Sequence, residues 1–197
     1  MRYDTEHKAR TRERVLQEAV LAIRAGGPES LGVAGVMKRA GLTHGGFYAH
    51  FDSREALLAA AIDEMFANAA ANFLRRTEGL APREALRAYV DFYLSKGHRD
   101  ARDSGCPYAL LSGDLPRMDA APRKRFAKGL ERLTGLMAGQ LGQIGHAAPE
   151  AAAASAIAEM IGALSIARAA GTGEQSDAIL ARSHASVCAR LGLESPR

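Results

Sequence analysis

The sequence feature that most constrains the fold is the segment LTHGGFYAHF at residues 42–51. Phe47 and Phe51 are four residues apart, so on a helix they share one face and can enter a core. The adjacent pair Gly45 and Gly46 costs a helix about 1 kcal/mol per residue relative to alanine. Folding alone does not explain this pair. A binding role does, because glycine lets a base edge or another backbone approach closely.

The residues just before this segment predict a second short helix. Residues 33–41 place apolar side chains on one helical face and end at Gly41, a typical residue after a helix C-terminus. Thr43 is expected to begin the next helix as its N-cap, through its hydroxyl. A helix, a glycine turn and a short helix form the helix-turn-helix pattern, whose second helix enters the DNA major groove.

The pattern from residue 33 to residue 58 resembles the DNA-binding domain of TetR-family transcriptional regulators. The resemblance is carried by the Ala40-Gly41 turn, by the Tyr-x-His-Phe sequence at residues 48–51, and by Arg54-Glu55 ahead of two leucines. One position departs from the family pattern. Gly32 stands where the family usually has Thr or Ser, which caps the second helix and can touch a phosphate.

The resemblance implies an all-α fold with two domains. Residues 1–52 would form a three-helix helix-turn-helix DNA-binding domain, and residues 53–197 a helical effector-binding and dimerisation domain. The expected function is a sequence-specific regulator, in this family most often a homodimeric repressor that a small-molecule effector releases from DNA. Its expected partners are a palindromic operator of double-stranded DNA, a small molecule and a second copy of the chain.

The residues expected to contact DNA lie in and beside the helix-turn-helix. The second helix, residues 43–50, would read bases, while basic and hydroxyl side chains around it would bind phosphates. The basic residues at the start of the first helix, residues 8–14, are expected to attract DNA phosphates as well. The DNA-contacting set comprises Lys38, Arg39, Thr43, His44, Gly45, Gly46, Tyr48, His50 and Arg54.

Charge and composition agree with this reading. The net charge is +4, and the first 54 residues hold nine basic against six acidic side chains, so most of the excess lies where the motif is. No apolar run approaches the roughly 20 residues of a membrane span. The two cysteines form no zinc spacing and no disulfide framework. We therefore expect a cytoplasmic protein without membrane contact.

Helical periodicity continues through the rest of the chain, with no convincing strand pattern. A long helix is expected over residues 53–76 with Ser53 as N-cap, and the segment 77–82 is the best domain boundary. Further helices are expected over residues 82–96, from Ser104 to Leu111, and over residues 122–144, 149–170 and 176–191.

Aromatic and sulfur-containing side chains in this region are candidates for an effector pocket between helices. Core packing is the more frequent role for any single one of them, but the resemblance implies that some line a ligand site. The candidate pocket residues are Phe66, Tyr89, Tyr93, Cys106, Tyr108, Phe126 and Met137.

The last two expected helices carry small residues that allow close helix approach, beside larger apolar ones. By resemblance they would form a four-helix bundle with their copies across a two-fold axis. The alternative is that they are buried within one chain. The candidate interface residues are Ile157, Ile161, Leu164, Leu180, Val187 and Leu191.

Cys106 supports a second hypothesis. In the first turn of a helix capped by Ser104, its thiol pKa would be lowered by the helix dipole, as in a sensor of oxidants or electrophiles. The alternative is a small buried apolar residue. If the Cys106→Ser variant still releases DNA normally when oxidant is added, the sensor hypothesis is excluded.

Enzymatic motifs are not found. The sequence lacks a glycine-rich phosphate loop, a His-Glu-x-x-His metal motif and a nucleophile elbow, so neither catalysis nor a cofactor or metal is expected. A rival from a different class is a helical ligand-binding protein that does not bind DNA.

Overall fold

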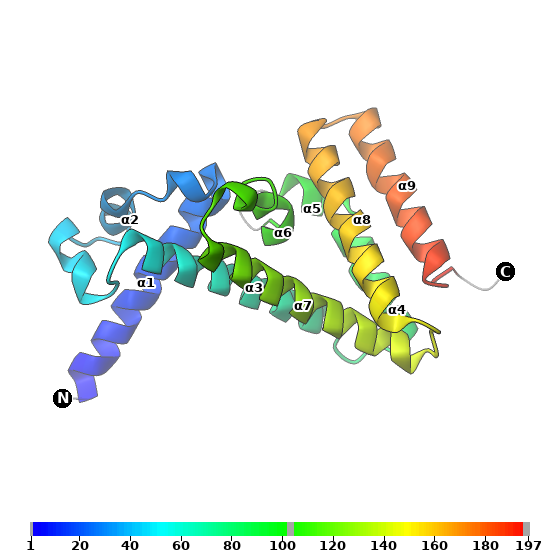
Figure 1. Cartoon of the computed structure of the whole chain (residues 1–197), viewed down its shortest axis with the longest axis horizontal. Coiled ribbons are helices and arrows are strands. Elements are labelled where there is room, and N and C mark those ends of the chain that lie inside the picture. The colour runs from blue at the N-terminus through cyan, green and yellow to red at the C-terminus, as the bar shows by residue number, and fades with distance from the viewer. Residues whose placement is uncertain (1, 102–104, 195–197) are drawn as a thin grey trace.

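The protein is built from helices (Figure 1). The computed structural model describes residues 2–101 and 105–194, and no β-strand occurs within these ranges. The predicted all-α class is therefore confirmed.

The N-terminal part, which we call the head, contains α1 (Arg2–Gly26), the 3-10 helix η1 (Pro28–Ser30), α2 (Val33–Arg39) and the 3-10 helix η2 (His44–Ala49). Helix α1 stops because Gly27 adopts a positive φ of 77° and Pro28 follows. The core of the head consists of the buried residues Val15, Leu16, Ala19, Val20, Ile23, Leu31, Val36, Met37, Phe47 and Phe51.

Helix α3 (Arg54–Thr77) connects the head to the remainder of the chain. Its first turn is capped by Ser53, whose hydroxyl accepts a 3.0 Å hydrogen bond from the backbone N–H of Ala56. This confirms the predicted helix and its cap. The helix packs against α1 in the head, and against α4, α6 and α7 beyond it. A shift of α3 would therefore move the head relative to the rest.

The C-terminal part, which we call the body, contains α4 (Pro82–Tyr93), α5 (Lys96–Asp100), α6 (Pro107–Leu111), the 3-10 helix η3 (Leu115–Arg117), α7 (Ala120–Gln143), α8 (Pro149–Ala169) and α9 (Glu174–Arg190). Three of these helices begin at a proline, which suits a first turn because proline lacks the N–H that would be unpaired there. Helix α7 lies beside α3, and α8 and α9 pack together at the end opposite the head (Figure 1).

One predicted helix, residues 82–96, is divided into two. Helix α4 ends at Tyr93, and the Ser95 hydroxyl caps α5 by accepting a 3.1 Å hydrogen bond from the backbone N–H of His98. Serine competes for backbone bonds in this way, which makes it a better cap than an interior residue. The break turns His98 back toward α4.

Helices α3 and α8 are long and apolar enough, by length and composition, to cross a membrane. Both pack against neighbouring helices through buried apolar residues. Core helices of folded domains share this composition, so the property is weak evidence for a membrane segment.

Candidate DNA interface and effector pocket

The turn between α2 and η2 is built by Gly41, which has a φ of +69°. Its N–H donates to the carbonyl of Lys38 at 3.0 Å, and the N–H of Leu42 donates to the carbonyl of Met37 at 2.9 Å. This pair of bonds is the Schellman arrangement that ends many helices. It fixes the direction in which the second segment leaves α2, as the helix-turn-helix pattern requires.

The second segment differs from its prediction in two respects. It forms a 3-10 helix over His44–Ala49 instead of an α-helix over residues 43–50, and the Thr43 side chain makes no capping bond. The tighter turn is closed by the backbone, because the N–H of Gly46 donates to the Thr43 carbonyl at 3.1 Å. The Thr43 hydroxyl is consequently not used as a cap.

Two phenylalanines anchor this segment to the head, as predicted. Phe47 is 1% exposed and Phe51 is buried, and their rings stack with centroids 6.0 Å apart. With these two side chains pointing inward, the opposite face of η2 is turned to solvent.

The outward face of η2 combines two exposed side chains with two adjacent glycines. Tyr48 is 68% exposed and His44 is exposed. A Cβ atom added to Gly45 would meet no atom within 4 Å, and one added to Gly46 would make only ordinary contacts of 3.7 Å. Neither glycine has a positive φ. Alanine would therefore fit both positions, and the fold does not require the glycines.

The basic side chains of α2 are not equivalent. Lys38 is exposed and makes no ion pair in the described structure, whereas Arg39 pairs with Glu18 of α1 at 3.0 Å. Lys38 is therefore the more available of the two for a phosphate.

The first turns of α1 and the end of η2 share a positively charged region around His50. Burial lowers the pKa of His50, and the charges of Lys8 and Arg12 lower it further. The Arg12 guanidinium also lies 4.6 Å from the centre of the Phe51 ring. A positive potential that disfavours protonation of a histidine favours a nearby phosphate for the same reason. The Nδ1 atom of His50 is buried without a hydrogen-bond partner among the described residues.

The Arg54 side chain, predicted to lie beside DNA, forms hydrogen bonds within the head. Its Nε donates to the Leu31 carbonyl at 2.8 Å and its Nη2 donates to the Pro28 carbonyl at 3.1 Å. These bonds tie the start of α3 to the segment that precedes α2. The geometry thus gives Arg54 a structural role that the sequence pattern did not indicate.

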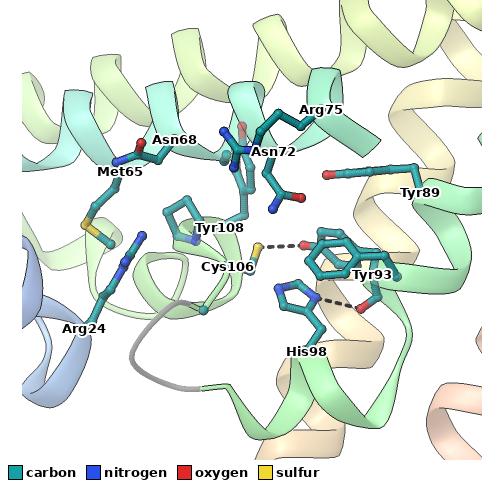
Figure 2. A pocket seen from close by; sticks show the side chains of 14 residues that line it. Arg24, Met65, Asn68, Asn72, Arg75, Tyr89, Tyr93, His98, Cys106 and Tyr108 are labelled. Atoms are coloured by element: carbon teal, nitrogen blue, oxygen red, sulfur yellow. Dashed lines mark hydrogen bonds between the residues drawn. The ribbon is translucent and has the colours of Figure 1, made fainter. Parts of the chain in front are cut away.

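A cavity of about 340 Å³ lies where the head meets the body (Figure 2). Four of the seven predicted pocket residues line it: Tyr89, Tyr93, Cys106 and Tyr108. The other lining residues come from α1, α3, α4, α5 and the start of α6. They are Arg24, Met65, Asn68, Ala69, Asn72, Arg75, Phe92, His98, Gly105 and Pro107.

Three predicted pocket residues do not line this cavity, and one of them, Phe66, lines a separate pocket between α3 and α7. The Phe66 ring packs against those of Tyr108 and Phe126, with centroids 5.0 and 5.7 Å away, and faces α7. Met137 is fully buried. Helical spacing marked all three as inward-facing, but it does not separate a packed position from one that borders a cavity.

The expected reactivity of Cys106 is not supported. The residue is the N-cap of α6, a helix of five residues, and Ser104 lies outside the described residues. Burial raises the pKa of the thiol, opposite to the predicted direction. Its Sγ lies 2.8 Å from the Tyr93 hydroxyl. The thiol is thus held in its neutral form.

His98 is a cavity residue that the sequence did not reveal. Its Nδ1 lies 2.9 Å from the Tyr93 carbonyl, which can only accept, so Nδ1 carries the proton and Nε2 is an acceptor (Figure 2). Burial lowers the pKa of His98 to about 4. The ring is therefore a neutral hydrogen-bond acceptor at pH 7.

Three other cavity residues that the sequence analysis missed share a recognisable spacing in the sequence. Asn68, Asn72 and Arg75 follow at spacings of four and three on α3, so they form a polar stripe on a largely apolar helix. Such a stripe is a recognisable sign of a polar site. No such sign marks Arg24 in the sequence, because it is distant along the chain from the other lining residues.

The predicted dimer interface requires correction. Five of its six residues are buried within the chain, between α8, α9 and their neighbours, and Ile161 is half-buried against the same core. The exposed side of α8 is different. It presents Ile166, which is 58% exposed, and the small residues Ala151, Ala154, Ala158 and Ala169.

The head and the body together have the architecture of a helix-turn-helix DNA-binding transcriptional regulator. Residues 15–61 match the family model described as bacterial regulatory proteins, tetR family. By this match, residues 15–61 form a DNA-binding domain of the tetR family.

Solved structures share the fold over nearly the whole chain. The reduced form of NemR from E. coli has a TM-score of 0.79 at 23% identity and covers 90% of this chain and 94% of its own. A TetR transcriptional regulator from Chloroflexus aurantiacus J-10-FL has a TM-score of 0.80 at 22% identity, covering 95% and 96%. A TetR-family regulator from Cytophaga hutchinsonii has a TM-score of 0.81 at 18% identity, covering 97% and 98%. No curated protein matched the sequence.

Proposed function

We propose that the protein is a homodimeric repressor that binds a palindromic operator and leaves it when a small molecule fills the cavity. The observation that carries the DNA-reading part is the open outer face of η2. Gly45 and Gly46 are not needed for the fold, so their lack of side chains serves close approach to a DNA base edge.

Affinity would come from phosphate contacts around this face. Lys38 and Tyr48 are exposed, and Lys8, Arg12 and His50 form the positively charged region beside them. Such contacts set register and strength, while the face of η2 selects the sequence. Two heads of a dimer would occupy successive major grooves about 34–36 Å apart.

Release would use α3, which packs against α1 and also lines the cavity. A ligand that binds one arrangement of α3 better than the other shifts the population toward it. If the favoured arrangement spaces the two heads wrongly, the dimer cannot fit both grooves.

Dimerisation would use the exposed sides of α8 and α9. The C-terminal end of α8 is linked to the cavity, because Arg168 donates to the carbonyls of His98 at 2.9 Å and Arg99 at 3.1 Å. Cavity occupancy would thereby act on the interface as well as on α3.

The test is selection of bound sequences from a randomised DNA pool, run with the wild type and Gly45→Ala. We expect the wild type to enrich a palindrome with half-sites about one turn apart. Gly45→Ala should fold normally yet lose most of this selectivity. The proposal fails if folded wild-type protein enriches no sequence at low salt, which would favour a ligand-binding protein without DNA binding.

The thiol-sensor alternative keeps its own test, although burial and the raised pKa of Cys106 weaken it. Under the proposed function, Cys106→Ser should respond to oxidants in a DNA-release assay as the wild type does. A response present in the wild type and lost in the variant would restore the sensor.

A further inference from the structure

A second hollow, which we call the α3–α7 cleft, lies between α3 and α7 and has a volume of about 480 Å³. The two helices lie side by side (Figure 1), and the cleft occupies the groove between them. It is separate from the cavity of Figure 2, because its lining residues on α3 and α7 do not line that cavity. The cleft therefore calls for an account of its own.

One side of the cleft is a row of basic side chains on α7. Lys124, Lys128 and Arg132 follow at intervals of four residues, so they lie on one face of the helix. All three are exposed. At about 1.5 Å of helix rise per residue, successive positions in the row are about 6 Å apart and the row is about 12 Å long.

These three cations have no hydrogen-bond or ion-pair partner in the described part of the chain. Asp63 is the one acidic residue among the described lining residues, and it pairs with a fourth basic residue, Arg125. Like charges four residues apart destabilise a helix, so folding alone does not explain the row. A ligand with several negative charges along its length would relieve the repulsion.

The floor of the cleft is apolar. Ala67 of α3 and Ala121 and Gly129 of α7 contribute little or no side chain, which leaves the cleft open above the buried Phe66 ring. This ring is held in place from behind, because its centroid lies 5.0 Å from that of Tyr108. The floor thus offers a fixed apolar surface for a flat ring of a ligand, next to the basic row.

The size of the cleft fits a molecule rather than a single ion. Its volume of about 480 Å³ is roughly three times that of a 150 Å³ cavity known to hold benzene. It also falls within the range of roughly 300–1,000 Å³ that is usual for small-molecule sites. A ring system together with a charged chain can therefore be accommodated.

From this combination we propose that the α3–α7 cleft binds a nucleoside diphosphate or triphosphate. The base packs on the apolar floor, and the phosphate chain follows Lys124, Lys128 and Arg132. A phosphate chain places several negative charges in a line, as the row requires, whereas a carboxylate supplies one. Lysine and arginine both form strong charge-assisted hydrogen bonds to phosphate oxygens. The inference goes beyond the proposed function, because the site lies outside the cavity assigned to the effector and needs no DNA.

Calorimetric titration of the full-length protein at constant ionic strength, without DNA, tests the ligand class. The probes are ATP, ADP, tripolyphosphate and adenosine. We expect saturable binding of ATP and weaker binding of ADP, which has one phosphate fewer. Tripolyphosphate should bind less tightly than ATP because it has no ring for the floor, and adenosine should show no saturable binding because it has no charge for the row.

Variants then assign the binding to the cleft. Lys128→Gln and Arg132→Gln should each weaken ATP about fivefold, because a charge-assisted hydrogen bond is lost. Arg123→Gln is the matched control, since Arg123 is an exposed cation of the same helix that does not line the cleft. Ala67→Phe keeps every charge but covers the floor, so it should weaken ATP and leave tripolyphosphate unchanged. Urea unfolding should give all four variants the stability of the wild type, because the four positions are exposed.

The inference is overturned if folded protein does not bind ATP saturably, or if Lys128→Gln and Arg132→Gln bind ATP as the Arg123 control does. Tripolyphosphate that binds as tightly as ATP, with no effect of Ala67→Phe on either, would also overturn it, because the floor would then have no role. If the two row variants weaken binding to all DNA sequences and leave ATP unaffected, the row contacts a nucleic-acid backbone instead. None of the titrations includes DNA, so failure of the proposed operator binding would leave their outcome unchanged.

Discussion

The Tyr108 hydroxyl donates a 2.8 Å hydrogen bond to the backbone carbonyl of Gly129, joining α6 to the middle of α7. The Phe66 ring of α3 occupies the space beside that glycine. A Cβ added to Gly129 would lie 2.5 Å from Cγ of Phe66. Helices α3 and α6, which line the cavity, therefore meet α7 at one residue that has no side chain.

This contact predicts that Gly129→Ala destabilises the protein by about 1–3 kcal/mol, because an overpacked core must shift a ring or the backbone. Urea unfolding measures the loss. Gly135→Ala on the same helix is the control, since no atom lies within 4 Å of its added Cβ. It should gain about 0.5–1 kcal/mol from helix propensity. Equal effects of the two substitutions would contradict the close packing of Phe66.

Arg54→Gln tests the structural role of that arginine. Removal of its bonds to the Leu31 and Pro28 carbonyls should lower the free energy of unfolding by about 1–3 kcal/mol. Lys38→Gln, by comparison, should leave the free energy of unfolding unchanged and weaken binding to all DNA sequences alike. It should also reduce the slope of the logarithm of the DNA-binding constant against the logarithm of salt concentration by about one. If Arg54→Gln is as stable as the wild type but its DNA binding depends less on salt, Arg54 contacts a DNA phosphate, as the sequence predicted.

The buried imidazole of His98 predicts a dependence of stability on pH. Above pH 6.5 the ring is neutral in both the folded and the unfolded chain, so it adds no slope. Between pH 6.5 and about 4 the unfolded chain binds a proton that the folded chain does not, so stability falls as the pH falls. The loss is on the order of 3 kcal/mol and is complete below pH 4.

This contribution is measured as the difference between wild type and His98→Gln in urea unfolding across pH 7.5 to 4. The variant should show a shallower slope over that range, while the surface variant His44→Gln should keep the wild-type slope. Parallel curves for all three proteins would show that His98 titrates normally in the fold.

The exposed side of α8 predicts the effect of Ile166→Glu. Because Ile166 is 58% exposed, the substitution should leave the monomer folded. A charge at the proposed interface should shift the protein from dimer to monomer in sedimentation velocity. Leu74→Glu, which places the same charge at a 47% exposed apolar position of α3, should remain dimeric. A dimeric Ile166→Glu would place the interface elsewhere.

Local features of the sequence predicted the helices well. Ser53 capped α3, Gly41 closed α2, and Pro82, Pro107 and Pro149 marked helix starts, because each acts on backbone bonds only a few residues away. The all-α class and the helix-turn-helix followed from these signals together with apolar spacing. The exceptions were η2, where the backbone closed a tighter turn than the side chains suggested, and the predicted helix over residues 82–96, which Ser95 divides into α4 and α5.

The site was less predictable because its residues meet only in three dimensions. Tyr89, Tyr93, Cys106 and Tyr108 were recognised as a chemical set, yet Phe66 had the same pattern and packs in the core. Arg24 and His98 reach the cavity through a helix crossing and a helix break that no local pattern encodes. The role of Arg54 likewise depends on carbonyls more than twenty residues away.

The position of α3 between the cavity and the head has a consequence for gene dosage. An effector that acts on the operator affinity through α3 must itself bind differently when the head is on DNA, and linkage requires the two effects to be equal in size. Under the proposed function, operator DNA weakens effector binding by the same factor by which effector weakens operator binding. Because all copies of the operator share one pool of repressor, a cell with many copies would reach half-maximal expression at a lower effector concentration than a cell with one.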